Sequence, residues 1–344
     1  MITAKALGAM PQFVLDAAGQ RVLDRALAQA GLPRRFIDQR DGYIPEHSLA
    51  TFVSSAARSV GHENIGLLWA PSLTVADYGA WGRYVLSAPT LGAALRRSER
   101  MMPFHSSTDT ATLYCAADKA VMRYQFGLPE HPAYTDIAFL AIGAVLSIFR
   151  SYLGPDWSPD RVHIDRQKPW HGDDAEATFG CPCVWNSHQL AIEFAPELLH
   201  TASSTLDRIL PATPHDIARE RQNGPPKTFA GRAEAVIRMQ IEENRVSIEN
   251  AAMALDTGVR TLQRRLAAEN ANFRSLTNRV LIARAKELIA ANQFSTTQIA
   301  VHLGFGSSNN FSRAFKTQTG LSPTQFRKQQ QGQVRAIART MTES

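Results

Sequence analysis

Cysteine is scarce in this chain of 344 residues, and its scarcity argues against two classes of protein. Only Cys115, Cys181 and Cys183 are present, so a secreted domain held together by disulfides is not expected. Structural zinc is not expected either, because one residue separates Cys181 from Cys183 and no second cysteine pair follows. The small, odd set predicts reduced thiols in a cytoplasmic protein.

Secretion signals and long apolar runs are missing as well. The N-terminus lacks the apolar run after a basic start that marks a signal peptide. The longest apolar run, residues 137–149, is too short to span a membrane and predicts a buried helix. Phosphate-binding loops and Gly-x-Gly-x-x-Gly motifs are also absent, which argues against NTPases and dinucleotide enzymes. We therefore expect no membrane association, cofactor, bound metal or catalytic residue.

Negative charge is scarce in the last third of the chain. Residues 225–344 hold 17 Lys and Arg against 8 Asp and Glu, whereas residues 1–224 hold 20 against 23. The net charge of +6 therefore arises from the C-terminal segment. A basic segment with apolar patterning is typical of nucleic-acid binding.

Two stretches of this basic segment, residues 247–266 and 295–315, share one pattern. Each is a short apolar-patterned helix, a turn with glycine, and a second helix that mixes apolar anchors with polar and cationic residues. This is the layout of a helix-turn-helix. One copy alone is as often a plain helical hairpin, but two copies around a third helix favour DNA binding.

The second copy follows simple physical rules. Ser295 and Gln298 form a capping box at the start of its first helix. Gly304 ends that helix, because glycine takes the left-handed conformation readily. Phe311 and Phe315, four residues apart, share the buried face of the second helix.

Polar side chains remain for the outward faces of both second helices. In the major groove, arginine can bond guanine and asparagine can bond adenine. In the first copy we expect base contacts from Arg260, Gln263 and Arg264, with Arg265 also directed to solvent or DNA. In the second copy we expect them from Ser308, Asn309, Asn310 and Arg313. Contacts to the DNA backbone, or support of the fold, are expected from Arg284, Lys316 and Arg327.

A helix predicted over residues 272–292 separates the copies. At ~1.5 Å per residue it is about 30 Å long. This is close to one turn of DNA, about 34 Å. Such a spacer could place two recognition helices in successive major grooves.

The segment resembles the DNA-binding domain of the AraC/XylS family of bacterial transcription regulators. The resemblance is carried by residues 262–266, 284–285, 299–300, 303–305, 311–316, 319–320, 322–323 and 326–327. One departure is Gly258, where the family usually has a serine that caps the first recognition helix. Glycine is a tolerable cap, so we expect a small loss of stability and no loss of function.

The N-terminal part predicts an α+β fold. Helices are expected over residues 12–32, 45–60 and 134–152, with another capped near Thr90. A β-hairpin is expected from residues 110–115 and 120–126, and further strands over 161–165 and 189–194. This part resembles the arabinose-binding-like sensor domain of one branch of the family, through residues 78–79, 86–95, 179–180 and 186–194.

The resemblance to the sensor domain implies effector sensing and allows dimerisation, without making arabinose the ligand. A small-molecule site combines aromatic walls with a few polar groups. The candidates are Tyr78, Trp81, Tyr84, Phe104, Tyr124 and Trp185.

Other clusters of reactive or charged residues give weaker evidence of function. Cys181-Pro182-Cys183 with His188 is poorly spaced for a metal, and Cys183 precedes valine rather than the histidine that an alkyl-accepting repair protein would need. The acidic run at 173–176 is expected to be a solvated loop. His163, on an expected strand, is more often a packed histidine than a ligand.

The sequence thus predicts four segments: a sensing and dimerisation domain (1–204), a linker (205–227), an all-α double helix-turn-helix domain (228–332) and a tail (333–344). The expected function is a cytoplasmic, effector-responsive activator. Its expected partners are double-stranded promoter or operator DNA, a small-molecule effector, RNA polymerase and a second copy of the chain. Alternatives are a constitutive DNA binder whose N-terminal domain only dimerises, and a small-molecule enzyme fused to a DNA-binding domain.

Overall fold

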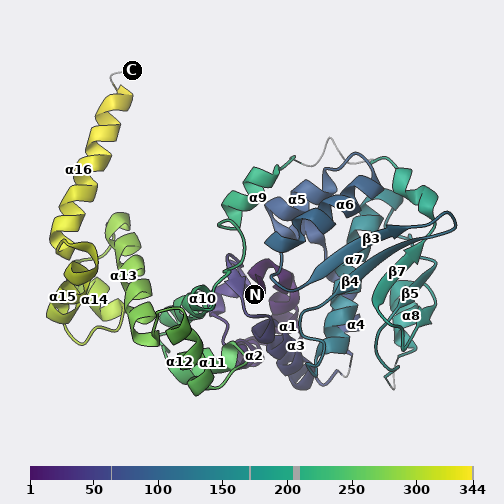
Figure 1. The fold of residues 1–344 in the computed structure, drawn as a ribbon, viewed down its shortest axis with the longest axis horizontal. Coiled ribbons are helices and arrows are strands. Elements are labelled where there is room, and N and C mark those ends of the chain that lie inside the picture. The colour runs from purple at the N-terminus through teal and green to yellow at the C-terminus, as the bar shows by residue number, and fades with distance from the viewer. Residues whose placement is uncertain (63, 170–171, 204–209, 343–344) are drawn as a thin grey trace. The chain divides into compact units, whose positions relative to one another are not determined.

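A computed structural model describes residues 1–62, 64–169, 172–203 and 210–342, with side chains as far as 332. The chain divides into two compact units, Met1–Lys227 and Thr228–Ser344. The first combines helices with sheets and the second is helical (Figure 1). The predicted α+β and all-α classes are therefore confirmed.

The first helices of unit 1 differ from the prediction. A single helix over residues 12–32 is wrong, because α1 (Met10–Ala18) and α2 (Gln20–Ala30) are separate helices. Gly19 breaks them apart with φ 80° and ψ 169°, a backbone conformation that glycine adopts readily. The helix predicted over 45–60 is confirmed as α3 (Glu46–Val60).

Three more helices precede the main sheet. They are α4 (Ile65–Trp69), α5 (Ala80–Leu86) and α6 (Leu91–Met101). The predicted cap at Thr90 is confirmed, since its hydroxyl accepts a hydrogen bond from the Ala93 amide at 3.2 Å. A two-stranded antiparallel sheet, not foreseen from the sequence, joins β1 (Ile2–Thr3) to β2 (Tyr43–Ile44).

The main sheet has five strands in the order β3-β4-β7-β5-β6. The predicted hairpin is confirmed as β3 (Thr110–Cys115) and β4 (Ala120–Gln125), with Leu113 opposite Met122. Antiparallel pairing continues through β7 (Leu190–Phe194) to β5 (Arg161–His163), and the short edge strand β6 (Cys183–Val184) runs parallel to β5.

Helix α7 (Tyr134–Leu153) is the core helix of unit 1. It lies against the sheet (Figure 1), and its residues Ala141, Ile142 and Val145 line a small pocket together with residues of β4 and β7. In the described part of the chain it is the one helix long and apolar enough to cross a membrane. However, 61% of its most apolar window is buried inside the fold, as in the core helix of a soluble domain.

Two segments expected to be irregular form helices. The acidic run at 173–176 is not a loop, because most of it belongs to α8 (Asp174–Phe179). The expected linker contains α9 (Pro214–Glu220), which packs on α5 within unit 1. A capping box between Thr213 and Asp216 starts this helix.

Unit 2 consists of helices throughout its described part. They are α10 (Phe229–Glu242), α11 (Ile248–Ala254), α12 (Val259–Ala268), α13 (Phe273–Ala291), α14 (Thr296–His302), α15 (Ser308–Thr319) and α16 (Pro323–Thr342). Helix α16 continues through residues 333–342, which the sequence assigned to a tail. Helix α13 is central, since α10, α14, α15 and α16 all pack on it.

Candidate nucleic-acid interface and interior cavity

The first helix-turn-helix is formed by α11 and α12. The Ser247 hydroxyl accepts the Asn250 amide at 3.2 Å and so starts α11. Helix α12 starts at Gly258 without a side-chain cap. Leu262 and Leu266 are fully buried and fix α12 against the rest of the unit. These anchors decide which face of α12 remains outside.

Arg260, Gln263 and Arg264 are exposed on the outer face of α12. Arg265 behaves differently from its neighbour, because its guanidinium lies 5.2 Å from the ring centroid of Phe229. Two adjacent arginines therefore have different surroundings. Arg264 makes no hydrogen bond, ion pair or ring contact with the described residues, whereas Arg265 covers an aromatic ring at the start of α10.

The second helix-turn-helix is formed by α14 and α15. The capping box of Ser295 and Gln298 is confirmed, as is the left-handed backbone of Gly304, whose φ is 74°. Ser307 caps α15 by accepting the Asn310 amide at 3.1 Å. Together these contacts satisfy backbone donors at the start of both helices.

Phe311 and Phe315 are fully buried, as predicted. They belong to a column of four rings, with centroids 5.3 Å apart for Phe305 and Phe311, and 5.5 Å apart for Phe315 and Phe326. Contacts at such distances add to the burial of the rings. The column fixes α15, so its opposite face remains outside.

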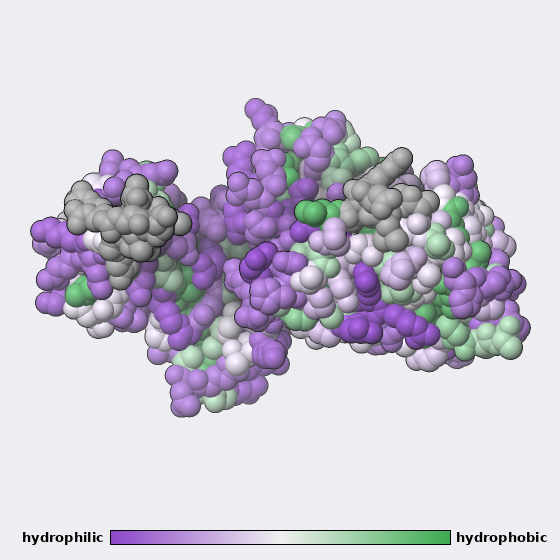
Figure 2. All heavy atoms as spheres, turned by 90° about the horizontal axis from the view of Figure 1, so that it is seen from above, coloured by the Kyte–Doolittle hydropathy of each residue, from purple (hydrophilic) through white to green (hydrophobic). Residues whose placement is uncertain are grey.

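The expected base-contact residues of α15 are all exposed: Ser308, Asn309, Asn310 and Arg313. The Arg313 guanidinium donates to Asn310 Oδ1 at 2.8 Å, which holds both side chains together. The visible face of unit 2, at the left of Figure 2, is mostly hydrophilic.

The three expected backbone-contact residues differ. Lys316 is exposed. Arg284 is half-buried and pairs with Glu287 at 2.7 Å. Arg327 is half-buried and donates to the carbonyl of Phe294, which ties α16 to the segment before α14.

Helix α13 separates the two motifs with 19 residues. Its length of about 28 Å at ~1.5 Å per residue is close to the expected spacing. At the other end of the unit, Glu269 at the end of α12 accepts the amides of Phe229 (2.9 Å) and Ala230 (2.7 Å). These backbone hydrogen bonds lower the pKa of Glu269. The start of α10 is thus tied to the end of a recognition helix.

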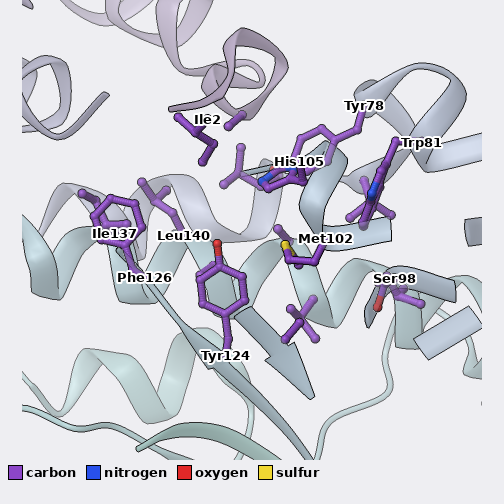
Figure 3. Close-up of a pocket in the computed structure, with 18 of the residues that line it drawn as sticks. Ile2, Tyr78, Trp81, Ser98, Met102, His105, Tyr124, Phe126, Ile137 and Leu140 are labelled. Atoms are coloured by element: carbon purple, nitrogen blue, oxygen red, sulfur yellow. The ribbon is translucent and has the colours of Figure 1, made fainter. Parts of the chain in front are cut away.

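Unit 1 contains an interior cavity between α7, the sheet and the segment before α5 (Figure 3). Its volume is about 70 Å³. Three of the six predicted ligand residues, Tyr78, Trp81 and Tyr124, line it.

The other three predicted ligand residues lie outside this cavity. Tyr84 is buried beneath the guanidinium of Arg97, 4.6 Å from its ring centroid. Trp185 packs edge-on against Phe139 at 6.1 Å. Phe104 is half-buried, and its carbonyl accepts the Tyr43 hydroxyl at 2.7 Å.

His105 lines the cavity and was missed by sequence reasoning. Its ring lies 5.2 Å from Tyr78 and 5.6 Å from Trp81, between centroids. Burial, and secondarily the charge of Arg221, lower its pKa to about 3. The imidazole is therefore neutral at physiological pH. A lone histidine after Phe104 gives no local signal of this position.

A buried polar cluster stands behind Tyr124. The Tyr124 hydroxyl donates to Asp109, whose other oxygen accepts the Gly127 amide at 2.9 Å. Burial raises the pKa of Asp109 to about 6. Glu46, also buried, accepts the Ser106 hydroxyl at 3.0 Å.

The end of α9 is attached to the cavity wall. Arg221 is 2% exposed and donates to the carbonyl of Tyr78 at 2.8 Å. Its neighbour Glu220 accepts the Ala80 amide at 2.8 Å, at the start of α5. Two residues of the expected linker thus bind the backbone at Tyr78 and Ala80, within the segment that supplies Tyr78 and Trp81 to the cavity.

The residues set aside in the sequence are engaged in the fold. His163 lies 3.2 Å from Glu193, and Glu176 accepts the Cys183 amide at 3.0 Å. Cys181 is buried, and all three cysteines are free thiols. Within the described residues, no group of three or more His, Cys, Asp or Glu side chains is placed to hold a metal ion.

Comparisons with known proteins agree with this architecture. Residues 22–202 match the family described as the N-terminal arabinose-binding domain of AraC transcription regulator, and residues 251–329 match a helix-turn-helix domain. The first match alone spans more than half of the chain.

Similar proteins extend over nearly the full length. The chain is 24% identical over 310 residues to the HTH-type transcriptional regulator VirS of Mycobacterium tuberculosis, covering 88% of this chain and 89% of that protein. It is 23% identical over 325 residues to the ornithine utilization regulator of Pseudomonas aeruginosa, covering 93% and 95%. A solved structure of transcriptional regulator CdpR from the same bacterium covers 90% of this chain and 97% of its own, at 21% identity and a TM-score of 0.40.

Proposed function

Because the chain belongs to the AraC family of DNA-binding transcription regulators, we propose that its two recognition helices read two successive major-groove segments of an operator. The observation that carries this proposal is the exposed polar face that the apolar anchors leave on α12 and α15. Base contacts are assigned to Arg260, Gln263, Arg264, Ser308, Asn309, Asn310 and Arg313.

The three remaining cationic residues have a second role in this proposal. Lys316, exposed and without a partner in the described part of the chain, contacts phosphate. Arg284 and Arg327 combine such contacts with support of the fold, since each already binds a neighbouring group. Loss of a phosphate contact weakens binding to all sequences alike and flattens its salt dependence.

Selection of bound fragments from the sheared source genome tests the assignment of base contacts. Wild type is compared with Arg264→Ala and with Arg265→Ala, which removes the same charge from the next residue. Losing a bidentate base contact costs about 1–3 kcal/mol, or roughly 5- to 150-fold, and relaxes preference at one base. Arg265→Ala retains the preferred sequence. Unchanged preference in Arg264→Ala contradicts the assignment.

Unit 1 is proposed to sense an effector in the cavity lined by Tyr78, Trp81 and Tyr124. The protein then acts in the cytoplasm as an activator that works with RNA polymerase, with dimerisation through unit 1. The ligand must favour one arrangement of the chain over another to have an effect. Support comes from Arg221, which binds the carbonyl of Tyr78 and lies seven residues before unit 2 begins.

The two alternatives make different predictions. With a constitutive binder, transcription of the target gene is the same with every metabolite tried. With an effector-responsive regulator, transcription changes when one class of metabolite is added. A reporter under an enriched promoter distinguishes the two. In the effector-responsive case, Ala144→Leu, which fills the cavity from α7, removes the response. An enzyme fused to a DNA-binding domain would need a nucleophile and base, and the sequence offers no such pair.

A further inference from the structure

The wall of the cavity in unit 1 is almost entirely apolar. Side chains of α7, β3, β4 and the N-terminal segment supply most of it, among them Leu140, Met122 and Ile2. Polar atoms come from five side chains only, those of Tyr78, Trp81, Ser98, His105 and Tyr124. A ligand there gains mainly from burial of its apolar surface.

Most of these polar atoms are already engaged. The Trp81 indole donates to the carbonyl of Met101 at 2.9 Å, and the Ser98 hydroxyl donates to Leu95 at 2.7 Å. The Tyr124 hydroxyl donates to Asp109. These three groups are therefore already hydrogen-bonded within the protein and are not available to a ligand as donors.

Tyr78 and His105 are the exceptions. The His105 Nδ1 atom is buried without a hydrogen-bond partner in the described part of the chain. The Tyr78 hydroxyl makes no hydrogen bond to a described residue, and both residues are more than 90% buried. Their rings are stacked, so the two groups belong to one side of the cavity, with Trp81 beside them (Figure 3). A buried polar group without a partner costs free energy that a ligand can recover.

Charge is absent from the lining. His105 is neutral at pH 7, and the nearby carboxylate of Asp109 is held behind Tyr124 by two hydrogen bonds. The buried guanidinium of Arg221 donates to the carbonyl of Tyr78 and does not line the cavity. An ionised ligand would therefore lose its hydration here without an opposite charge in contact with it, which is strongly unfavourable. A sugar would leave most of its hydroxyl groups unpaired for the same reason.

We infer that this cavity binds a small, uncharged, largely apolar molecule that carries one hydrogen-bonding group facing Tyr78 and His105. The inference rests on the proposed effector response and specifies its ligand class. The cavity volume of about 70 Å³ is roughly half of the ~150 Å³ that holds a benzene ring, so the ligand is no larger than a single ring and the lining side chains must move apart to admit one. Sugars and amino acids are excluded, whatever the names of the matched domain and of similar proteins suggest.

Ligand binding to the full chain can be followed by tryptophan fluorescence during thermal unfolding. All five tryptophans lie in residues 1–227, so the signal reports on unit 1 alone. The probes are phenol and toluene, which share a shape and differ in the hydroxyl group, with L-arabinose and L-ornithine as polar probes. Phenol and toluene are expected to raise the midpoint, and the two polar compounds are not.

Two variants locate the binding. Tyr78→Phe is expected to lower the ratio of phenol affinity to toluene affinity by about threefold to tenfold, the effect of one hydrogen bond. Tyr84→Phe, a matched change outside the cavity, leaves the ratio unchanged. Ala144→Leu abolishes binding of both probes while the fold is retained.

The outcomes separate this inference from the proposed function. The ligand class is overturned if neither phenol nor toluene binds, if Ala144→Leu leaves their binding intact, or if arabinose or ornithine binds and Ala144→Leu prevents it. An equal phenol-to-toluene ratio in wild type and Tyr78→Phe also overturns it. The reporter tests the effector response separately. If transcription responds to a polar metabolite, the effector response stands and this ligand class is wrong. If phenol binds and the reporter does not respond, the ligand class stands and the effector response is wrong.

Discussion

The buried neutral histidine makes the stability of unit 1 sensitive to acid. His105 has a folded pKa of about 3, against about 6.5 for the unfolded chain. Below pH 6.5 the unfolded chain therefore binds a proton that the folded chain does not. By linkage, this lowers the free energy of unfolding as pH falls through 6.5, and the loss continues down to the folded pKa.

The size of the loss follows from the window between the two pKa values. Each unit of pH below 6.5 costs about 1.4 kcal/mol, so at pH 5 the group costs about 2 kcal/mol. His105→Phe removes this term and keeps a ring between Tyr78 and Trp81. It leaves no partner unsatisfied, because Nδ1 has none in the described residues.

The assay is urea unfolding of the full chain at pH 7 and pH 5, followed by tryptophan fluorescence. Between these values, wild type should lose about 2 kcal/mol more than His105→Phe. His188→Gln, a change at an exposed histidine, should behave as wild type. Equal pH dependence of wild type and His105→Phe would refute the reasoning, because it would mean that the imidazole is hydrated or paired in the folded protein.

Three further results are expected. Asp109→Asn removes a proton uptake that stabilises the fold in acid. Because the folded pKa is raised to about 6, wild type should gain about 1 kcal/mol relative to this variant between pH 6 and 5, measured by the same unfolding assay. Phe311→Ala should destabilise unit 2 by about 3–5 kcal/mol, seen by circular dichroism in urea, because the ring is fully buried. Arg221→Met should leave operator binding in the absence of effector unchanged. In allosteric proteins an effector typically changes affinity 5- to 150-fold, and in this variant the change in operator affinity, measured by fluorescence-anisotropy titration, should be close to none.

Local physics explains why unit 2 could be predicted well. A capping box joins residues three apart, and the buried pair Phe311 and Phe315 lies within two turns of one helix. Gly304 meets a backbone requirement that few other residues satisfy. Each of these signals lies within a few residues, so the sequence contains it directly. Phe305 and Phe326, which complete the ring column, carry no comparable periodic signal.

The cavity could be predicted only in part, because it depends on long-range packing. Aromatic composition pointed to Tyr78, Trp81 and Tyr124, but equally to Tyr84, Phe104 and Trp185, which pack elsewhere. Which aromatic residues reach the cavity is decided by how α7 and α6 lie against β3 and β4. His105 follows the same rule, since its neutral state results from burial by residues distant in sequence.

The segment between the units connects two anchored ends, and this favours a response carried through the linker. On one side, Arg221 holds the carbonyl of Tyr78, a residue of the cavity wall. On the other, Glu269 at the end of α12 holds the first amides of α10. Residues 222–228 lie between these anchors. In the proposed mechanism, a ligand that moves Tyr78 also moves the start of the linker. The end of the linker is attached to α12 through Glu269. The ligand can therefore affect the first recognition helix without contacting DNA.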